Sequence, residues 1–111
     1  MSNQDTGWLG ELRAAVYVRR HGMRVLARRY RAGHGEIDLI AREGDTLVFI
    51  EVKSRPRGKI GDGARAVNGE KQRRIRSAAR QYVSAHPWPG GFRFDVIEIS
   101  AAGLRQIKNA F

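Results

Sequence analysis

The sequence predicts an α/β domain, and the order of its hydrophobic patterns is the main reason. Helical spacing near the N-terminus is followed by three stretches of strand-like alternation, then by a second helical stretch and one or two further strands. That order is typical of an α/β domain. A chain of 111 residues with 41% hydrophobic content is the size of one globular domain, so we expect residues 1–111 to form a single unit.

The first helix is expected over residues 6–21, with Thr6 as its N-cap and Gly22 as its natural stop. Apolar residues recur there at spacings of three and four, which predicts a buried stripe. A first strand is expected over residues 23–31 and a turn over residues 32–35. The predicted stripe of the helix comprises Trp8, Leu12, Ala15 and Val16.

The most informative stretch is a predicted hairpin of residues 36–41 and 46–53. A two-residue turn at Gly44-Asp45, with glycine first, is a favoured hairpin connection. The resulting register gives one wholly apolar face, and a one-residue slip would spoil it. That face comprises Ile37, Leu39, Ala41, Val48, Ile50 and Val52. On the other face, the register places Asp38 opposite Glu51, and Glu36 opposite Lys53 as its expected ion-pair partner in preference to a metal-shell role.

A second helix is expected over residues 68–85, capped by Asn68 and ended by Pro87 and Pro89. A loop rich in arginine, lysine and glycine precedes it over residues 54–66, and strands are expected over residues 92–99 and 104–108. The buried stripe of this helix is expected to comprise Ile75, Ala78, Ala79, Tyr82 and Val83.

Charge gives the first indication of function. Lysine and arginine number 21 against 11 acidic residues, for a net charge of +10. Such an excess attracts polyanions, of which nucleic acid is the commonest inside cells, although membranes and ribosomes also bind basic proteins. The chain has no apolar run near the ~20 residues of a membrane span, no signal-peptide pattern and no cysteine. We therefore expect a cytoplasmic protein that does not enter membranes.

Asp38, Glu51 and Lys53 are the candidate catalytic residues because the hairpin register brings them to one face. Facing side-chain carbons lie about 5 Å apart, and two carboxylates at that distance repel unless a cation lies between them. A hard ion such as Mg²⁺ is the natural partner, and the Lys53 ammonium could orient water or stabilise a charged phosphate. This set can support metal-dependent phosphodiester hydrolysis; an ordinary surface ion pair of Glu51 with Lys53 is the alternative.

The spacing of these residues resembles a nuclease motif. Asp38, twelve residues and Glu51-Val52-Lys53 are similar to the core of the PD-(D/E)XK nucleases. A wider set of motifs resembles the YraN-like family of bacterial proteins, which is related to archaeal Holliday-junction resolvases and to restriction-endonuclease folds. The set comprises Gly10-Glu11 with Ala14, Tyr30-Arg31, residues 35–41, residues 48–55, Ala66-Val67, Lys71-Gln72 and residues 93–96.

The resemblance implies a restriction-endonuclease-like three-layer domain, in which a mixed central β-sheet is flanked by helices. It implies that Asp38 and Glu51 bind Mg²⁺ (or Mn²⁺), with the backbone carbonyl of Val52 completing the metal shell. Lys53 would be the catalytic base or an electrostatic partner. Glu11 resembles the helix acid that supports the site in related resolvases, and partnership with the helix dipole is an equally good explanation.

Five further residues are candidate contacts to nucleic acid. Arg55, Arg57 and Lys59 lie in the basic loop and could hold backbone phosphates, although charged loops are usually just solvated. Lys71 and Gln72 open the second helix and could touch a phosphate or a metal-bound water. For these two, an exposed polar first turn is the alternative.

The sequence therefore favours a Mg²⁺-dependent endonuclease that acts on structured DNA, such as branched or junction intermediates. Junction cleavage requires two active sites, so a homodimer is expected if the analogy holds. The first alternative is a catalytically silent nucleic-acid-binding module of the same fold in a DNA- or RNA-processing complex. The second is a basic scaffold that docks on a protein partner, which needs only the charge.

Overall fold

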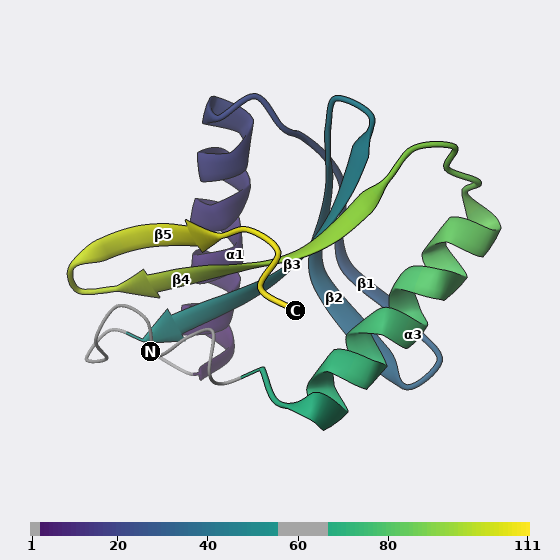
Figure 1. Cartoon of the computed structure of the whole chain (residues 1–111). Helices are drawn as coiled ribbons and strands as arrows, with labels where there is room; N and C mark the ends of the chain where they lie inside the picture. Colours follow the sequence, from purple (N-terminus) through teal and green to yellow (C-terminus); the bar gives the residue numbers. More distant parts are fainter. Residues whose placement is uncertain (1–2, 56–66) are drawn as a thin grey trace.

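The computed structural model describes residues 3–55 and 67–111 and arranges them in three layers (Figure 1). The strands of these residues form one five-stranded sheet in the order β1-β2-β3-β4-β5. Only β3 and β4 pair in parallel there, so the sheet is mixed, as predicted. The fold is consistent with a restriction-endonuclease-like domain. In chain order the elements are α1 (Asn3–Arg20), β1 (Arg24–Ala32), β2 (Gly35–Glu43), β3 (Thr46–Arg55), α3 (Gly69–Ala85), β4 (Phe92–Ser100) and β5 (Gly103–Ile107).

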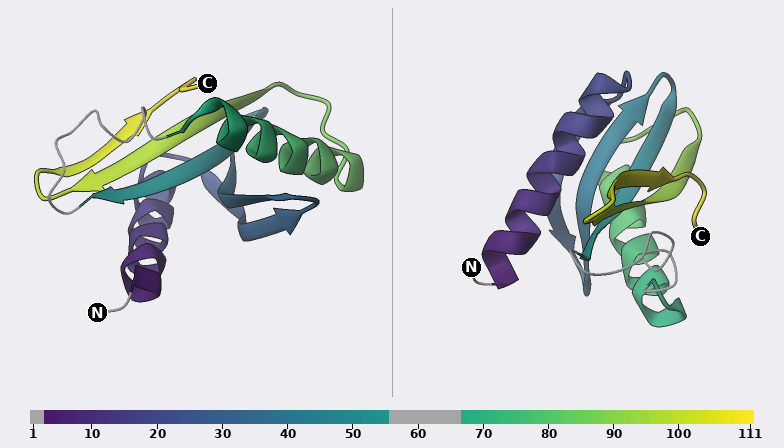
Figure 2. Two further views of the ribbon diagram at one scale, coloured as in Figure 1. Left: turned by 90° about the horizontal axis from the view of Figure 1, so that it is seen from below. Right: turned by 90° about the vertical axis from the view of Figure 1, so that its left-hand side faces the viewer.

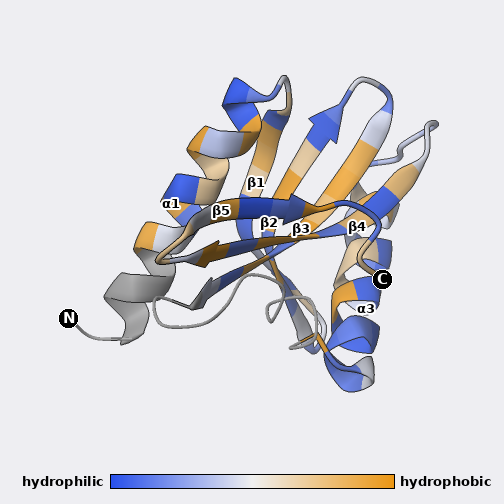
Figure 3. Ribbon diagram, turned by 60° about the vertical axis from the view of Figure 1, so that its left-hand side comes forward, coloured by the Kyte–Doolittle hydropathy of each residue, from blue (hydrophilic) through white to orange (hydrophobic). Residues whose placement is uncertain are grey.

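The two helices cover opposite faces of the sheet, as both views in Figure 2 show. Hydrophobic residues concentrate along the central strands, while each helix also carries hydrophilic positions (Figure 3). None of the described helices is long and apolar enough to cross a membrane. The α1 side buries Ala14, Ala15, Val18, Leu39, Ala41, Val48 and Ile50. The α3 side buries a second cluster that includes Ile40, Leu47, Phe49, Ile75, Ala78, Tyr82 and Phe94.

The β2–β3 hairpin has the predicted turn and the predicted register. Its paired residues run from Glu43 with Thr46 to Leu39 with Ile50. Gly44 adopts a φ of 58°, a left-handed conformation that glycine accepts without a steric penalty. The alternation of the two strands therefore fixed their pairing, because a slip would have exposed the buried face.

The regular β2–β3 pairing ends before the charged residues. Two expectations are therefore corrected: that Asp38 and Glu51 form a regular facing pair, and that the apolar face continues to Ile37. Asp38 and Glu51 lie beyond the last β2–β3 pair, and the Asp38 carboxylate accepts a hydrogen bond from the Val52 N–H. A side chain directed at the neighbouring backbone departs from the alternation of a regular strand. Consistent with that departure, Ile37 packs in the α3 cluster, whereas Leu39 packs against α1, so the predicted apolar face was wrong at Ile37.

The first helix differs from its prediction at its start and on its buried side. It begins at Asn3, so Thr6 lies inside it and is not its N-cap. Of the predicted stripe, Ala15 is buried but Val16 is 46% exposed. Among residues 9–20 the buried ones are Gly10, Ala14, Ala15 and Val18, and the small ones let the helix approach the sheet closely. The Trp8 side chain lies outside the described part of the chain.

The second half of the chain follows the predictions closely. Asn68 caps α3 by accepting a hydrogen bond from the Lys71 N–H at 2.9 Å. The last two predicted strands correspond to β4 and β5. Within the predicted stripe of α3, Val83 is half-buried, and the buried residues are Ile75, Ala78, Ala79 and Tyr82.

Candidate active site

Asp38 lies where the β2–β3 ladder ends, and its carboxylate replaces a backbone partner there. Asp38 Oδ2 accepts a 2.8 Å hydrogen bond from the backbone N–H of Val52. Burial, followed by the negative charge of Glu51, raises the pKa of Asp38 to about 8. The Val52 N–H opposes this shift because it stabilises the charged carboxylate. Asp38 and Glu51 therefore interact closely, although they lie beyond the last regular pair of the hairpin.

Glu51 is a buried carboxylate that two ammonium groups approach. Glu51 is 5% exposed, and its pairing partner on β4 is the fully buried Val96. Glu51 Oε1 lies 3.6 Å from Lys53 Nζ, two residues along the same strand. The same oxygen lies 2.5 Å from Lys71 Nζ, which reaches it from the first turn of α3. A buried charge is tolerated only when it is paired, and these contacts supply the pairing.

The two lysines have opposite pKa shifts. Burial lowers the pKa of Lys53, and the adjacent Lys71 ammonium lowers it further because like charges repel. Burial also disfavours the charged form of Lys71, but hydrogen bonding to Glu51 and Lys53 outweighs it and raises the pKa of Lys71. Lys53 is consequently the more readily deprotonated of the two, and Lys71 is the more firmly charged.

Glu11 reaches the same region from α1 and is held by an arginine. Glu11 Oε2 accepts a 2.6 Å hydrogen bond from Arg29 Nε on β1. The charge of Glu11 also contributes to the raised pKa of Asp38, as the smallest of its causes. Since α1 begins at Asn3, Glu11 lies beyond the first turn, where the helix dipole has little effect. The placement near Asp38 thus favours the supporting role over the dipole role.

Arg29 is held in a conformation that a side chain rarely adopts. Its φ is 51°, in the left-handed region that favours glycine. Such backbone strain costs about 1–3 kcal/mol and clusters at functional sites. Sequence reasoning missed Arg29, because nothing distinguished it from its neighbours in the run Arg28-Arg29-Tyr30-Arg31.

The remaining predicted contacts divide into three groups. Lys71 joins the site, whereas the Gln72 amide donates a 2.9 Å hydrogen bond to the carbonyl of Val67. Glu36 approaches Arg31 Nε at 3.5 Å, which corrects its expected pairing with Lys53. The irregular end of β2 accounts for this change, since Glu36 lies beyond the regular register. The Arg55 side chain and the residues Arg57 and Lys59 lie outside the described residues.

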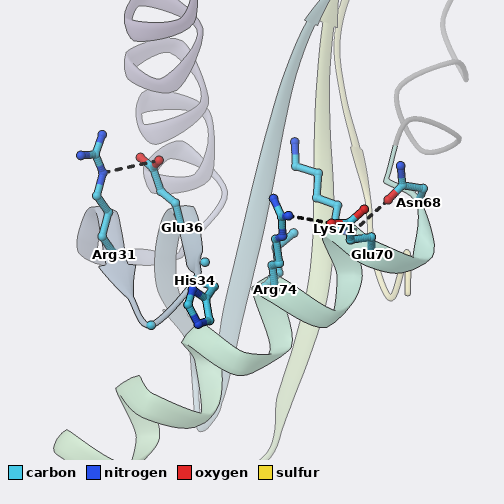
Figure 4. Close-up of a pocket in the computed structure, with 10 residues that line it drawn as sticks. Arg31, His34, Glu36, Asn68, Glu70, Lys71 and Arg74 are labelled. Carbon is cyan, nitrogen blue, oxygen red and sulfur yellow. Dashed lines mark hydrogen bonds and ion pairs between the residues drawn. The ribbon is translucent and has the colours of Figure 1, made fainter.

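A cavity of about 620 Å³ opens beside Lys71, between the β1–β2 turn and the first half of α3 (Figure 4). Its size falls within the range of ordinary ligand pockets. In Figure 4 the ion pairs Arg31–Glu36 and Arg74–Glu70 stand on opposite sides of it. The cavity could admit an anionic group to the neighbourhood of Lys71. Its labelled lining residues are Arg31, His34, Glu36, Asn68, Glu70, Lys71 and Arg74.

The described residues contain no group of three or more His, Cys, Asp or Glu side chains able to hold a metal. A metal here would depend on two carboxylates and on backbone oxygen.

Sequence reasoning also missed Glu98, which β4 aligns with Lys53 in the parallel pairing and which is 2% exposed. The sequence did contain a signal for it: a glutamate inside the apolar run Val96-Ile97-Glu98-Ile99 indicates a buried carboxylate with a partner, because glutamate is rarely buried alone.

The fold and the charged cluster together define an α/β domain with a polar centre at the end of a hairpin. The chain belongs to the uncharacterised protein family UPF0102, whose model matches residues 10–99. It is 39% identical over 109 residues to a UPF0102 protein of Herminiimonas arsenicoxydans, covering 98% of this chain and 88% of the relative. A UPF0102 protein of Shewanella amazonensis is 42% identical over 107 residues, which is 96% of this chain and 99% of the relative.

Proposed function

We propose that this chain is a metal-dependent endonuclease that hydrolyses phosphodiester bonds. Asp38, Glu51 and the backbone carbonyl of Val52 would hold Mg²⁺ or Mn²⁺. One observation carries the proposal: two interacting carboxylates, one buried and one half-buried, lie beside two ammonium groups where the regular β2–β3 pairing ends. Membership of the family establishes the relatives of the chain, and the chemistry of this site supports the activity.

The donor set fits a hard divalent ion. The pKa of Asp38 is raised because its negative charge is buried near that of Glu51, so a cation between them would relieve both causes. Mg²⁺ is commonly bound by one or two carboxylates together with waters and substrate phosphates. In a strand, the N–H and C=O of one residue point to the same side. Because the Val52 N–H points at Asp38, we expect the Val52 carbonyl to face the same place.

The lysines suit distinct parts of the reaction. Bound Mg²⁺ would supply a Lewis acid for the phosphate and an acidified water as the nucleophile. Lys53, whose pKa is lowered by burial, is the better suited of the two lysines to accept a proton from water. Lys71, whose pKa is raised by hydrogen bonding to Glu51 and Lys53 against the effect of burial, is suited to stabilise negative charge that develops on phosphate.

The proposed substrate is structured DNA such as a branched or junction intermediate. The net charge of +10 supports attraction to a polyanion, and the cavity beside Lys71 offers an anionic group a route to the site. Cleavage of a junction needs one active site for each cut strand. A homodimer is therefore part of this proposal.

One observation favours a second candidate, a nucleic-acid-binding module without turnover. Glu51 already has an ammonium group at 2.5 Å and another at 3.6 Å, so its charge is compensated without a metal. If that pairing outcompetes a divalent ion, the same surface binds phosphate and cleaves nothing.

Cleavage and binding assays on matched variants separate the two candidates. Labelled single-stranded, duplex, flap and four-way-junction DNA are incubated with Mg²⁺, Mn²⁺ or EDTA. We expect metal-dependent cleavage by the wild type, a loss of more than about 100-fold in Asp38→Asn and Glu51→Gln, and nearly unchanged DNA binding. Asp45→Asn is the matched control, because Asp45 is an exposed carboxylate at the hairpin turn, away from the site and its cavity, and should leave cleavage intact. Wild-type binding without cleavage in every metal would reject the enzyme and favour the binding module.

A further inference from the structure

A second recognition surface lies farther along α3, where aromatic rings meet two arginines. A pocket of about 360 Å³ is lined by Phe49, Phe92, Phe94, Arg76 and Arg80, together with small apolar residues of α3. Its volume is at the small end of the ~300–1,000 Å³ range of ligand sites, which suits one flat ring better than a peptide helix. None of the residues predicted for catalysis from the sequence lines it.

Phe92 is the exposed member of an aromatic cluster. It is 60% exposed, whereas Phe94 and Phe49 are 7% and 1% exposed. Its ring centroid lies 6.2 Å from that of Phe94 and 6.4 Å from that of Phe49, and both contacts are edge-on. The buried rings hold Phe92 in place while its own surface remains in contact with water. A large exposed aromatic ring at a pocket is characteristic of a binding surface.

The two arginines beside these rings, Arg76 and Arg80, are available to bind an anion. Arg76 and Arg80 lie one helical turn apart on α3, and the Arg76 guanidinium lies 5.2 Å from the centre of the Phe94 ring. Within residues 3–55 and 67–111, no salt bridge involves either arginine. The pocket thus combines aromatic faces with cations that lack a carboxylate partner in the described structure.

We propose that this pocket binds an unpaired nucleotide, with its base stacked on Phe92 and its phosphate held by Arg80. Exposed aromatic rings beside basic side chains are the usual equipment of single-strand-binding surfaces, because every base offers a flat face. An acidic peptide with an aromatic side chain would use the same chemistry. The net charge of +10 and the small pocket favour the nucleotide.

The position of the pocket relates it to the candidate active site. Arg76 and Arg80 lie five and nine residues after Lys71 on α3, which is about 7.5 Å and 13.5 Å along the helix axis. Phe49 precedes Glu51 by two residues on β3, so both side chains point to the same face. If the chain is the nuclease proposed above, the pocket would select DNA with unpaired nucleotides near the cleaved bond. This part of the inference rests on the proposed function. As a binding site it stands without that function.

The test measures DNA binding in EDTA, where cleavage cannot contribute. Fluorescein-labelled single-stranded DNA and blunt duplex are titrated with wild type, Phe92→Ala and Phe92→Trp. We expect Phe92→Ala to weaken single-strand binding about 5-fold to 100-fold and to affect duplex binding much less. Phe92→Trp, which keeps an aromatic ring at this position, should bind single strands about as well as the wild type. Arg80→Gln should lower the salt slope of binding by about one unit. Val16→Ala, an exposed apolar position on α1, is the control and should change nothing.

Ultraviolet cross-linking to an oligonucleotide carrying 5-iodouracil adds a readout of stacking itself. A cross-link at Phe92 supports the inference, and this result would stand even if the wild type never cleaved DNA. Equal single-strand affinity of wild type and Phe92→Ala would overturn it and leave the nuclease proposal intact. Binding of a glutamate–tyrosine copolymer that depends on Phe92, with DNA binding that does not, would overturn it in favour of an acidic protein partner.

Discussion

Charges from four elements meet at the end of the β2–β3 hairpin. Asp38 comes from β2, Glu51 and Lys53 from β3, and Lys71 from α3, while α1 adds Glu11. Burying such groups is costly, and replacing buried ion pairs by apolar residues often leaves stability unchanged or improved. Stability therefore does not explain why the chain places them together. The functional site that we propose, which needs carboxylates and ammonium groups at close range, would account for it.

The raised pKa of Asp38 predicts how stability varies with pH. The pKa is about 8 in the folded chain, above its ordinary value of 3.8, so the folded state binds more protons between these limits. The stabilising contribution is complete below about pH 4 and is lost as pH rises through about 8. Without metal, we expect the free energy of unfolding of the wild type to fall over this range relative to that of Asp38→Asn.

Urea unfolding at pH 5, 6, 7 and 8 in EDTA measures this difference. The asparagine keeps an oxygen for the Val52 N–H, so the comparison isolates the ionisation. Mg²⁺ should stabilise the wild type increasingly as pH rises toward 8, because metal binding requires the charged carboxylate. Parallel curves for the two proteins in EDTA would contradict a raised pKa at Asp38.

The close contact of β2 with α3 is what brings Lys71 to the sheet. A methyl group on Gly35 would lie 2.2 Å from the Arg74 carbonyl oxygen, which is backbone and cannot move alone. We expect Gly35→Ala to destabilise the fold by about 1–3 kcal/mol and to weaken cleavage by shifting α3. In the control Gly69→Ala, the added carbon meets only Arg73 Nη1 at 3.6 Å, so urea unfolding should show stability unchanged or slightly raised.

A second polar group holds β5 and the C-terminal residues to β4. Asp95 is fully buried and accepts hydrogen bonds from Arg93 at 3.0 Å, from Gln106 at 2.8 Å and from the Asn109 N–H at 3.1 Å. Asp95→Ala removes the buried acceptor of these hydrogen bonds and leaves Arg93 with Glu43 as its remaining partner. We therefore expect the free energy of unfolding to fall by about 3–5 kcal/mol, measured by calorimetry. Asp45→Ala, at the exposed hairpin turn, should cost less than about 0.5 kcal/mol. Similar losses in both variants would show that this network contributes little.

Across the whole molecule, local pattern predicted most of the fold. Alternation fixed the β2–β3 register, and Asn68 marked the start of α3, because both signals come from residues close in sequence. The buried side of α1 was mispredicted because small residues such as Ala14 bury easily, while Val16 offers apolar character without contact to the sheet. A pattern of apolar residues shows which side chains are hydrophobic. It does not show which of them are small enough to let the helix pack closely on the sheet.

Glu11 and Lys71 were also named as candidates, but the contacts within the candidate site were predicted only inside one hairpin. Asp38 and Glu51 were paired from the register, but the contacts of Lys71 with Glu51 and of Arg29 with Glu11 join elements distant in sequence. Such contacts depend on how helices dock on the sheet, which strand periodicity does not encode. The irregular end of β2 was also hidden, because it arises from one side chain bonding to the backbone of the next strand.

The most direct test of the metal-dependent site is a switch of metal preference at Asp38. The chain contains no cysteine, so Asp38→Cys introduces a single thiol. Thiolate prefers softer ions than carboxylate does. Cleavage of a four-way junction is measured for wild type and variant with Mg²⁺, Mn²⁺, Zn²⁺ and Cd²⁺. We predict that the wild type cleaves with Mg²⁺ and that the variant loses this activity and regains part of it with Zn²⁺ or Cd²⁺. Undiminished Mg²⁺-dependent cleavage by the variant, or no cleavage by the wild type with any metal, would contradict a metal-dependent nuclease centred on Asp38.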